Sequence, residues 1–291
     1  MIRHGQRLAL PALSQPVAAQ PSRPAAPQAS QPELSAESGP VTGAINTTGS
    51  AVAAVDSMSL ATGGALDIGV AVLDRQTGQL SLGAEGAAPF YSASVVKLFT
   101  VVDILHRVET GQATLSQTQL NYIQRALTVS DDNAMNALWE QFGGSSTVTE
   151  LVGLANLQDT QPPSDPGEWG ETKLSARDVV AVYQYLLTSL NPGDQQLVLN
   201  ALSSAQNTGA DGFDQAFGLL QTPRLSGVAA KQGWMVDDGY EYLHSTGIVG
   251  SDNRFLVAVL SKRPASNGYD VARADVSTAV GRLTGSLGLT S

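Results

Sequence analysis

Residues 94–105 read SVVKLFTVVDIL, with a serine and a lysine three positions apart at the head of a long apolar run. Side chains three positions apart on a helix lie on one face, so Lys97 can reach the hydroxyl of Ser94. In a partly desolvated site the pKa of a lysine falls, and the neutral amine can then take the serine proton. The pattern S-x-x-K is common, however, and an N-cap serine followed by a solvated lysine explains it equally well.

Two motifs further along the chain add weight to that pattern. The first is SDDN (residues 130–133), and the second is KQGW (residues 231–234), which ends an apolar stretch. They follow Ser94 in that order, with about 36 positions to Ser130 and about 100 more to Lys231. Taken separately, Ser130 reads as an N-cap residue and Lys231 as a solvated lysine at a strand end. It is improbable that all three motifs occur in this order by chance, so these separate explanations are weak when the motifs are taken together.

The ordered set S-x-x-K, S-D-N and K-T-G is the signature of class A β-lactamases and penicillin-binding proteins. From about Asn46 to about Leu287 the chain therefore resembles the catalytic domain of the serine β-lactamase and D-alanyl-D-alanine peptidase superfamily, with the class A β-lactamases closest. The resemblance implies an α/β (α+β) fold, in which an antiparallel sheet packs with the terminal helices and an all-helical lobe fills the middle. The active site is then expected in the groove between sheet and lobe.

The hydrophobic pattern predicts elements in an order that suits this fold. Residues 175–178 read SARD, a capping box with aspartate in the acidic position, and open one of the helices. Helices are predicted at 47–60, 94–109, 115–127, 132–142, 175–188, 194–203 and 268–283, and strands at 66–73, 79–83, 229–234, 240–249 and 255–262.

The resemblance also implies roles for single residues. Ser94 is the expected nucleophile, and Lys97 activates it. Ser130 relays a proton to the leaving nitrogen, while the positive charge of Lys231 lowers the proton affinity of Ser130 and attracts a substrate carboxylate. The backbone N–H groups of Ser94 and Trp234 are expected to form the oxyanion hole. These residues make an acyl-serine mechanism the leading hypothesis.

Residues 132 and 232–234 are the expected substrate-binding positions, and two of them depart from the family pattern. Asp132 stands where the family has asparagine, and a carboxylate accepts hydrogen bonds but donates none unless it is protonated. It is expected instead to pair with Lys97 and to raise the pKa of that lysine. Gln232 replaces a threonine or serine whose hydroxyl binds the substrate carboxylate. Gly233 keeps its family role, which is to let the strand backbone approach the substrate closely.

The residue that activates water for deacylation is not evident. Class A β-lactamases carry this glutamate in E-x-x-L-N, on a loop before the helix that Ser175 opens here. Glu171, with Leu174 and Ser175 after it, echoes that motif but abuts the capping box and so lies too late in the loop. Glu168 is the other carboxylate within reach. Without such a glutamate, an acyl-enzyme is expected to form and to hydrolyse slowly, as penicillin-binding peptidases do with β-lactams.

The amino-acid composition argues against several classes of binding partner and active site. The chain has 291 residues and a formal net charge of −10, which argues against nucleic acid or an anionic membrane surface as a partner. It has no cysteine, and its three histidines, His4, His106 and His244, leave little material for a Ser-His-Asp triad or a metal site. We expect no cofactor and no metal, a small-molecule or peptide substrate (β-lactam or peptidoglycan-like), and a monomer.

Residues 1–43 have a different composition, rich in Ala, Pro, Gln and Ser and holding 7 of the 14 prolines. Such a stretch buries too little apolar surface to offset the entropy of ordering, so it is predicted to be a disordered tail or linker before a domain at 44–291. Its start combines basic residues with a short apolar run, which fits either a shortened signal sequence or a plain linker. The family resemblance implies an extracytoplasmic location (secreted, periplasmic or cell-wall associated).

Three functions remain open from the sequence. The first is a serine hydrolase acting on β-lactams or cell-wall-like amides, with slow turnover if the deacylating carboxylate is absent. The second is a non-catalytic binding module that keeps the fold with an eroded site, which Asp132 and Gln232 favour. The third is another amide hydrolase on the same scaffold, such as a glutaminase-like enzyme.

Overall fold

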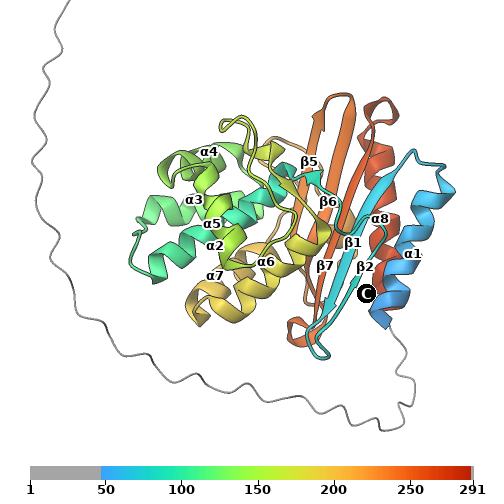
Figure 1. Cartoon of the computed structure of the whole chain (residues 1–291), viewed down its shortest axis with the longest axis horizontal. Helices are drawn as coiled ribbons and strands as arrows, with labels where there is room; N and C mark the ends of the chain where they lie inside the picture. The colour runs from blue at the N-terminus through green and yellow to red at the C-terminus, as the bar shows by residue number, and fades with distance from the viewer. Residues whose placement is uncertain (1–46, 290–291) are drawn as a thin grey trace, which may run out of the picture. The chain divides into compact units, whose positions relative to one another are not determined.

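The computed structural model describes residues 47–289, which build a five-stranded antiparallel sheet between two groups of helices (Figure 1). The strand order is β2-β1-β7-β6-β5, so a strand from the start of the domain pairs with one from near its end. The strands are β1 (Asp67–Asp74), β2 (Gln79–Leu82), β5 (Ala229–Asp237), β6 (Tyr240–Val249) and β7 (Phe255–Pro264). A second, two-stranded sheet pairs β3 (Phe90–Tyr91) with β4 (Lys173–Leu174).

The helices divide by their position in the chain, as the fold class predicted. Helices α1 (Thr47–Ala61) and α8 (Tyr269–Ser286) lie side by side on one face of the sheet (Figure 1). The other face carries the helical lobe, which contains α2 (Val96–Glu109), α3 (Gln117–Thr128), α4 (Asp132–Gln141), α5 (Ser145–Leu154), α6 (Ala176–Ser189) and α7 (Pro192–Ser203). The predicted antiparallel sheet with terminal helices and an all-helical lobe is therefore confirmed.

The central strands are apolar on both faces because helices cover both. Along β7, Leu256, Ala258 and Leu260 join the core that includes the helical lobe. The residues between them, Val257 and Val259, join the core beneath α1 and α8. Alternate side chains of a strand point to opposite faces, so an unbroken apolar run such as FLVAVL requires cover on both sides.

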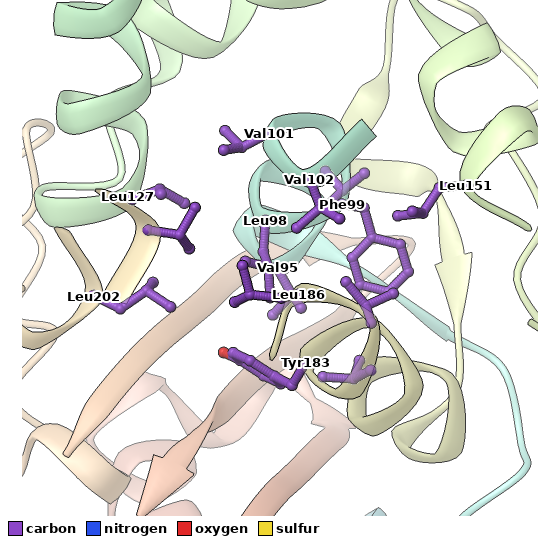
Figure 2. Close-up of a cluster of buried hydrophobic side chains, with 14 of the residues drawn as sticks. Val95, Leu98, Phe99, Val101, Val102, Leu127, Leu151, Tyr183, Leu186 and Leu202 are labelled. Atoms are coloured by element: carbon purple, nitrogen blue, oxygen red, sulfur yellow. The ribbon is translucent and has the colours of Figure 1, made fainter. Parts of the chain in front are cut away.

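Helix α2 is the buried axis of the lobe. Every residue from Val96 to Leu105 is buried. Figure 2 shows Leu98, Phe99 and Val102 of this helix among side chains from other helices of the lobe, including Leu151 and Leu186. Truncating a leucine or phenylalanine in such a core typically costs about 2–5 kcal/mol. Ser94 and Lys97 are thus attached to one of the most firmly packed elements of the protein.

The five strands of the large sheet and most helices occur where the hydrophobic pattern predicted them, with ends that differ by a few residues, whereas the short strands β3 and β4 were not predicted. One helix, α5, was not predicted. The capping box predicted at Ser175 is only half correct. The Ser175 side chain accepts a hydrogen bond from the backbone N–H of Asp178. The carboxylate of Asp178 instead accepts from the backbone N–H groups of residues 158, 159 and 160, and so ties the loop before β4 to α6.

The predicted tail at residues 1–43 lies outside the described residues. Within residues 47–289, no helix is both long enough and apolar enough to cross a membrane.

Candidate active site

Ser94 lies at the junction between a 3₁₀ turn, η1 (Ala93–Val95), and helix α2. The helix was predicted to begin at Ser94, but the α-helix begins at Val96 because the preceding three residues wind more tightly. Ala93 has a φ of 45°, a left-handed conformation that a non-glycine residue adopts only where its surroundings enforce it. The turn leaves Ser94 only 5% exposed.

Lys97 lies one turn after Ser94 and is completely buried. Its Nζ is 2.8 Å from Ser94 Oγ, as the S-x-x-K spacing predicted. The same Nζ is 2.7 Å from the carbonyl oxygen of Ser130 and 3.2 Å from Ser130 Oγ. The amine therefore joins two hydroxyls that are 36 positions apart in the sequence.

Ser130 stands between two lysines. Its Oγ accepts a hydrogen bond from Lys231 Nζ at 2.9 Å, in addition to its contact with Lys97. Ser130 has a φ of 55°, which turns both its carbonyl and its hydroxyl toward Lys97. The Lys231 backbone is positioned by Thr246, whose hydroxyl donates to the Lys231 carbonyl at 2.9 Å. Four side chains from η1, α2, the α3–α4 turn and β5 thus form one continuous hydrogen-bonded chain, Ser94–Lys97–Ser130–Lys231.

The two lysines share a buried environment that disfavours their charged forms. Burial lowers the pKa of Lys97, while the carboxylate of Asp132 opposes that shift. Burial also lowers the pKa of Lys231 well below its usual range, and the neighbouring charge of Lys97 lowers it further. Two ammonium groups that share one hydroxyl repel each other, so a neutral amine in the pair is favoured. A neutral amine beside a serine hydroxyl is a general base.

The carboxylates of the SDDN motif have different roles. Asp131 is the N-cap of α4, and its side chain accepts from the backbone N–H groups of Asn133 and Ala134. Asp132 begins the helix and points toward Lys97, with Oδ1 2.5 Å from the lysine Nζ. The Asp132 side chain is nevertheless 61% exposed. The predicted pairing of Asp132 with Lys97 is therefore present, at the edge of the site and in contact with solvent.

Residues 232–234 lie in β5, which runs past η1, and their side chains face different ways. A Cβ on Gly233 would lie 3.0 Å from the Ser92 carbonyl oxygen, so glycine permits the close approach of β5 to the turn. The side chain of Gln232 is buried, and its Nε2 donates to the Phe217 carbonyl oxygen at 2.5 Å. Gln232 was predicted to bind substrate, but its amide is directed to that carbonyl and does not line the cavity. Trp234 does line it.

Ser94 opens into a cavity of about 390 Å³. Asp132, Glu168 and Trp234 are among its walls, and the remaining lining residues are Ala93, Asn136, Gly167, Trp169, Gly170 and Met235. Of the two glutamates considered for deacylation, Glu168 lines this cavity, whereas Glu171 does not. Ser94 and Trp234 share the cavity, as an oxyanion hole made of their N–H groups requires, and that role stays a prediction. Residues 47–289 hold no cluster of histidine and carboxylate side chains suited to a metal ion.

Among the cavity residues that sequence reasoning missed, Trp169 and Asn136 are in contact with each other. The Trp169 ring lies 4.8 Å from Lys97 Nζ, measured to the ring centre, and its Nε1 donates to Asn136 Oδ1 at 2.7 Å. This contact holds the loop that carries Glu168 against α4. The spacing of Asn136 after the SDDN motif was the only signal in the sequence, and no local pattern marks Trp169.

Comparison with known proteins gives the same fold and a family. The model of the Beta-lactamase enzyme family matches residues 50–122 and 118–284. A Mycobacterium tuberculosis protein named "Putative lipoprotein LppW" is 38% identical over 217 residues, covering 73% of this chain and 68% of that protein. Its counterpart from Mycobacterium bovis matches to the same extent.

Solved structures of similar fold include β-lactamases and a penicillin-binding protein. The TLA-3 extended-spectrum β-lactamase superposes with a TM-score of 0.67 at 14% identity, over 82% of this chain and 99% of its own. The β-lactamase from Streptosporangium roseum gives 0.64 at 15% identity, over 82% and 98%. A point mutant of PBP-A, in an acyl-enzyme complex with penicillin G, gives 0.65 at 17% identity, over 82% and 96%. The chain belongs to the Beta-lactamase enzyme family, and its fold is shared with class A β-lactamases and PBP-A.

Proposed function

We propose that this protein is a serine acyl-hydrolase whose Ser94 is acylated by β-lactams or by cell-wall-like amides. The observation that carries the proposal is the buried hydrogen-bonded chain Ser94–Lys97–Ser130–Lys231. The simpler explanations of the motifs, a capping serine or a solvated lysine, each require a side chain that points elsewhere. The family membership supports the same reaction class.

In the proposed acylation, neutral Lys97 takes the proton of Ser94 through their 2.8 Å contact. Ser94 Oγ attacks the carbonyl carbon, and the carbon–nitrogen bond of the substrate breaks. Ser130 gives its proton to the leaving nitrogen and is reprotonated from Lys97 across 3.2 Å. The products of this half-reaction are an ester on Ser94 and an amine, which leaves when the substrate is an open-chain amide and stays attached to the acyl group when it is a β-lactam, and all protons are accounted for within the site.

We propose that deacylation is slow. It requires a base that activates a water molecule beside the ester, and the E-x-x-L-N glutamate of class A β-lactamases has no clear equivalent. Glu168 lines the cavity but is exposed to solvent, and Glu171 lies outside the cavity lining. Burial and the negative charges of Asp237 and Glu168 raise the pKa of Glu171. A raised pKa makes a carboxylate a stronger base, but Glu171 does not line the cavity into which Ser94 opens, so its position suits the role of deacylating base poorly.

The second candidate function is a binding module with an eroded site. The observation that favours it is the 2.5 Å contact between Asp132 and Lys97, because a carboxylate stabilises the ammonium form and opposes its use as a base. The two proposals differ in one outcome. A catalytic protein forms a covalent adduct at Ser94, whereas a binding module forms none while its fold stays intact.

We also propose that the protein works outside the cytoplasm. The support is the word lipoprotein in the name of LppW and the family resemblance. Protease added to intact cells of the source organism should degrade a protein exposed outside the membrane and should spare a cytoplasmic one.

Intact-protein mass spectrometry after incubation with benzylpenicillin tests the acylation proposal. We expect a mass increase of one penicillin in the parent protein and none in Ser94→Ala. Ser57→Ala is the matched control, because Ser57 is an exposed serine on α1 and should leave the adduct unchanged. Hydrolysis of nitrocefin measures turnover. Slow release supports a penicillin-binding activity, and fast release makes the protein a β-lactamase. A folded parent protein without an adduct would favour the binding module.

A further inference from the structure

The walls of the Ser94 cavity combine negative charge with aromatic surface. Its charged lining residues are Asp132 and Glu168, and both side chains are exposed. The indole rings of Trp169 and Trp234 line it as well. No lysine or arginine is among the lining residues, all of which lie within the described part of the chain. Lys97 Nζ lies 4.8 Å from the Trp169 ring centre and Phe213 stacks on one face of Trp234, so an incoming ligand meets the exposed carboxylates and the remaining indole surface.

A second cavity, of about 210 Å³, continues this acidic surface. It shares Asp132 with the first and adds Asp131 and Asp211. Arg125 offsets Asp131, with Nη2 2.5 Å from Oδ2. Asp211 has no ion-pair partner among residues 47–289, and its Oδ2 accepts from Trp234 Nε1 at 3.0 Å. The carboxylate of Asp211 thus lies at the edge of one of the rings that line the first cavity.

Lys97 pairs with Asp132, yet neither catalytic lysine presents its amine at the surface. Lys97 is 0% exposed and Lys231 is 1% exposed, and burial lowers the pKa of both. Lys231 Nζ is directed to Ser130 Oγ and to the Gln232 carbonyl at 2.7 Å. The resemblance gave Lys231 the task of attracting a substrate carboxylate, yet its ammonium is covered by these two oxygens. Within the described residues, the cavity therefore offers no exposed cation to an anionic ligand, whereas the exposed carboxylates of Asp132 and Glu168 are available to a cationic ligand.

We propose that the Ser94 cavity selects acyl substrates whose side chain carries a free ammonium group, held by Glu168 and Asp132 of this cavity and Asp211 of the adjoining one, beside the remaining indole surface of Trp169 and Trp234. The inference rests on the proposed acylation, because it names the substrate class of that same site. Its physical basis is independent of the nucleophile: carboxylates attract a cation, and indole faces add cation–π attraction when the cation lies over the ring.

Two penicillins that differ in one group provide the test. Ampicillin carries an α-amino group that benzylpenicillin lacks, and this amine is charged at about pH 6. At low ionic strength we expect ampicillin to acylate Ser94 roughly threefold to tenfold faster. The ratio should approach one in the double variant Glu168→Gln with Asp211→Asn, and also in high salt, which screens exposed charges. Asp270→Asn, on α8, is the matched control and should keep the parental ratio.

A binding arm separates this inference from the acylation proposal. Ser94→Ala cannot be acylated, so calorimetric titration of this variant with each penicillin reports recognition alone. We expect Ser94→Ala to bind ampicillin more tightly than benzylpenicillin. Adding Glu168→Gln and Asp211→Asn to this variant should remove the preference. If the parent protein forms no adduct but Ser94→Ala still prefers ampicillin, the proposed function fails and the inference stands. Equal affinities, tighter binding of benzylpenicillin, or no binding of ampicillin at its highest soluble concentration would overturn the inference.

Discussion

Two opposing effects act on the pKa of Lys97. Burial favours the neutral amine, which can accept the Ser94 proton, while Asp132 favours the ammonium. Because Asp132 is 61% exposed, water weakens its attraction, and an ion pair of this kind contributes about 0–1 kcal/mol. Burial is the larger influence, so the pKa of Lys97 is lowered overall. Asp132 is therefore expected to slow the acylation without preventing it.

The first prediction concerns Asp132→Asn. Removing the carboxylate removes the attraction that opposes the lowered pKa of Lys97, so more of the amine is neutral at a given pH. An asparagine also supplies the amide donor that the family uses at this position. We expect acylation by a fluorescent penicillin to become about twofold to fivefold faster at neutral pH, and its rise with pH to begin at lower pH.

Second-order acylation rates measured from about pH 5 to 9 check this prediction, with Asp67→Asn as a remote control at the exposed start of β1. A slower Asp132→Asn protein with an unmoved pH profile would show that the carboxylate assists catalysis.

The sequence predicted the residues of the hydrogen-bonded chain but not all of the cavity wall. Ser94 and Lys97 are fixed by helical spacing, and Ser130 and Lys231 follow from the order of motifs. Trp169 and Asp211 come from loops, whose side chains reach the site only after the strands and helices have packed. The orientation of Gln232 was also hidden, because it depends on which face of β5 turns toward the lobe.

At the scale of elements, the site depends on how closely β5 passes η1. Gly233 lies at the contact, where a Cβ would meet the Ser92 carbonyl oxygen at 3.0 Å, Val95 Cγ2 at 3.1 Å and His244 at 3.2 Å. Ser94 follows Ser92 by two residues, and Lys231 precedes Gly233 by two. The spacing between strand and turn therefore sets the spacing between Ser94 and Lys231.

The second prediction concerns Gly233→Ala. The added methyl must push β5 away from η1, and such overpacking costs about 1–3 kcal/mol. We expect a loss of stability of that size in urea unfolding, and a loss of acylation by roughly tenfold or more because the contact between Lys231 and Ser130 lengthens. Gly281→Ala in α8 is the matched control, since a Cβ there meets nothing within 4 Å and should be neutral or stabilising. Equal effects of the two substitutions would argue against a spacing role for β5.

Most elements could be predicted because their patterns are strong and their ends carry signals. Strand β7 is an unbroken apolar run, and α6 opens at a serine cap. Helix α5 was missed because its N-cap is Gly144, which has no capping side chain, and because it includes β-branched residues and Gly153. Its formation depends on burial of Val148 and Leu151 in the lobe core, which only the assembled fold provides.

At the scale of the whole molecule, two buried titratable groups make stability depend on pH in opposite directions. Asp103 of α2 is fully buried, and burial raises its pKa from 3.8 to about 7 although Arg107 lies 2.7 Å away. His244 of β6 is also fully buried, and burial lowers its pKa from 6.5 to about 4. The stabilising contribution of Asp103 to the free energy of unfolding is fully present below pH 3.8 and is lost as pH rises through about 7. The His244 contribution is present above pH 6.5 and is lost as pH falls toward about 4.

The third prediction separates the two groups with Asp103→Asn. In the parent protein, the opposite effects of Asp103 and His244 on stability partly cancel between about pH 4 and 7. Of these two effects, the variant keeps only that of His244. We expect the variant to gain stability steadily across this window. The difference in the free energy of unfolding between the two proteins should then change in favour of the variant by as much as about 4 kcal/mol between pH 4 and pH 7. Urea unfolding at each pH measures it, and Asp67→Asn, an exposed carboxylate, should run parallel to the parent. Parallel curves for parent and Asp103→Asn would mean that Asp103 stays ionised in the folded protein, held by Arg107 against the cost of burial.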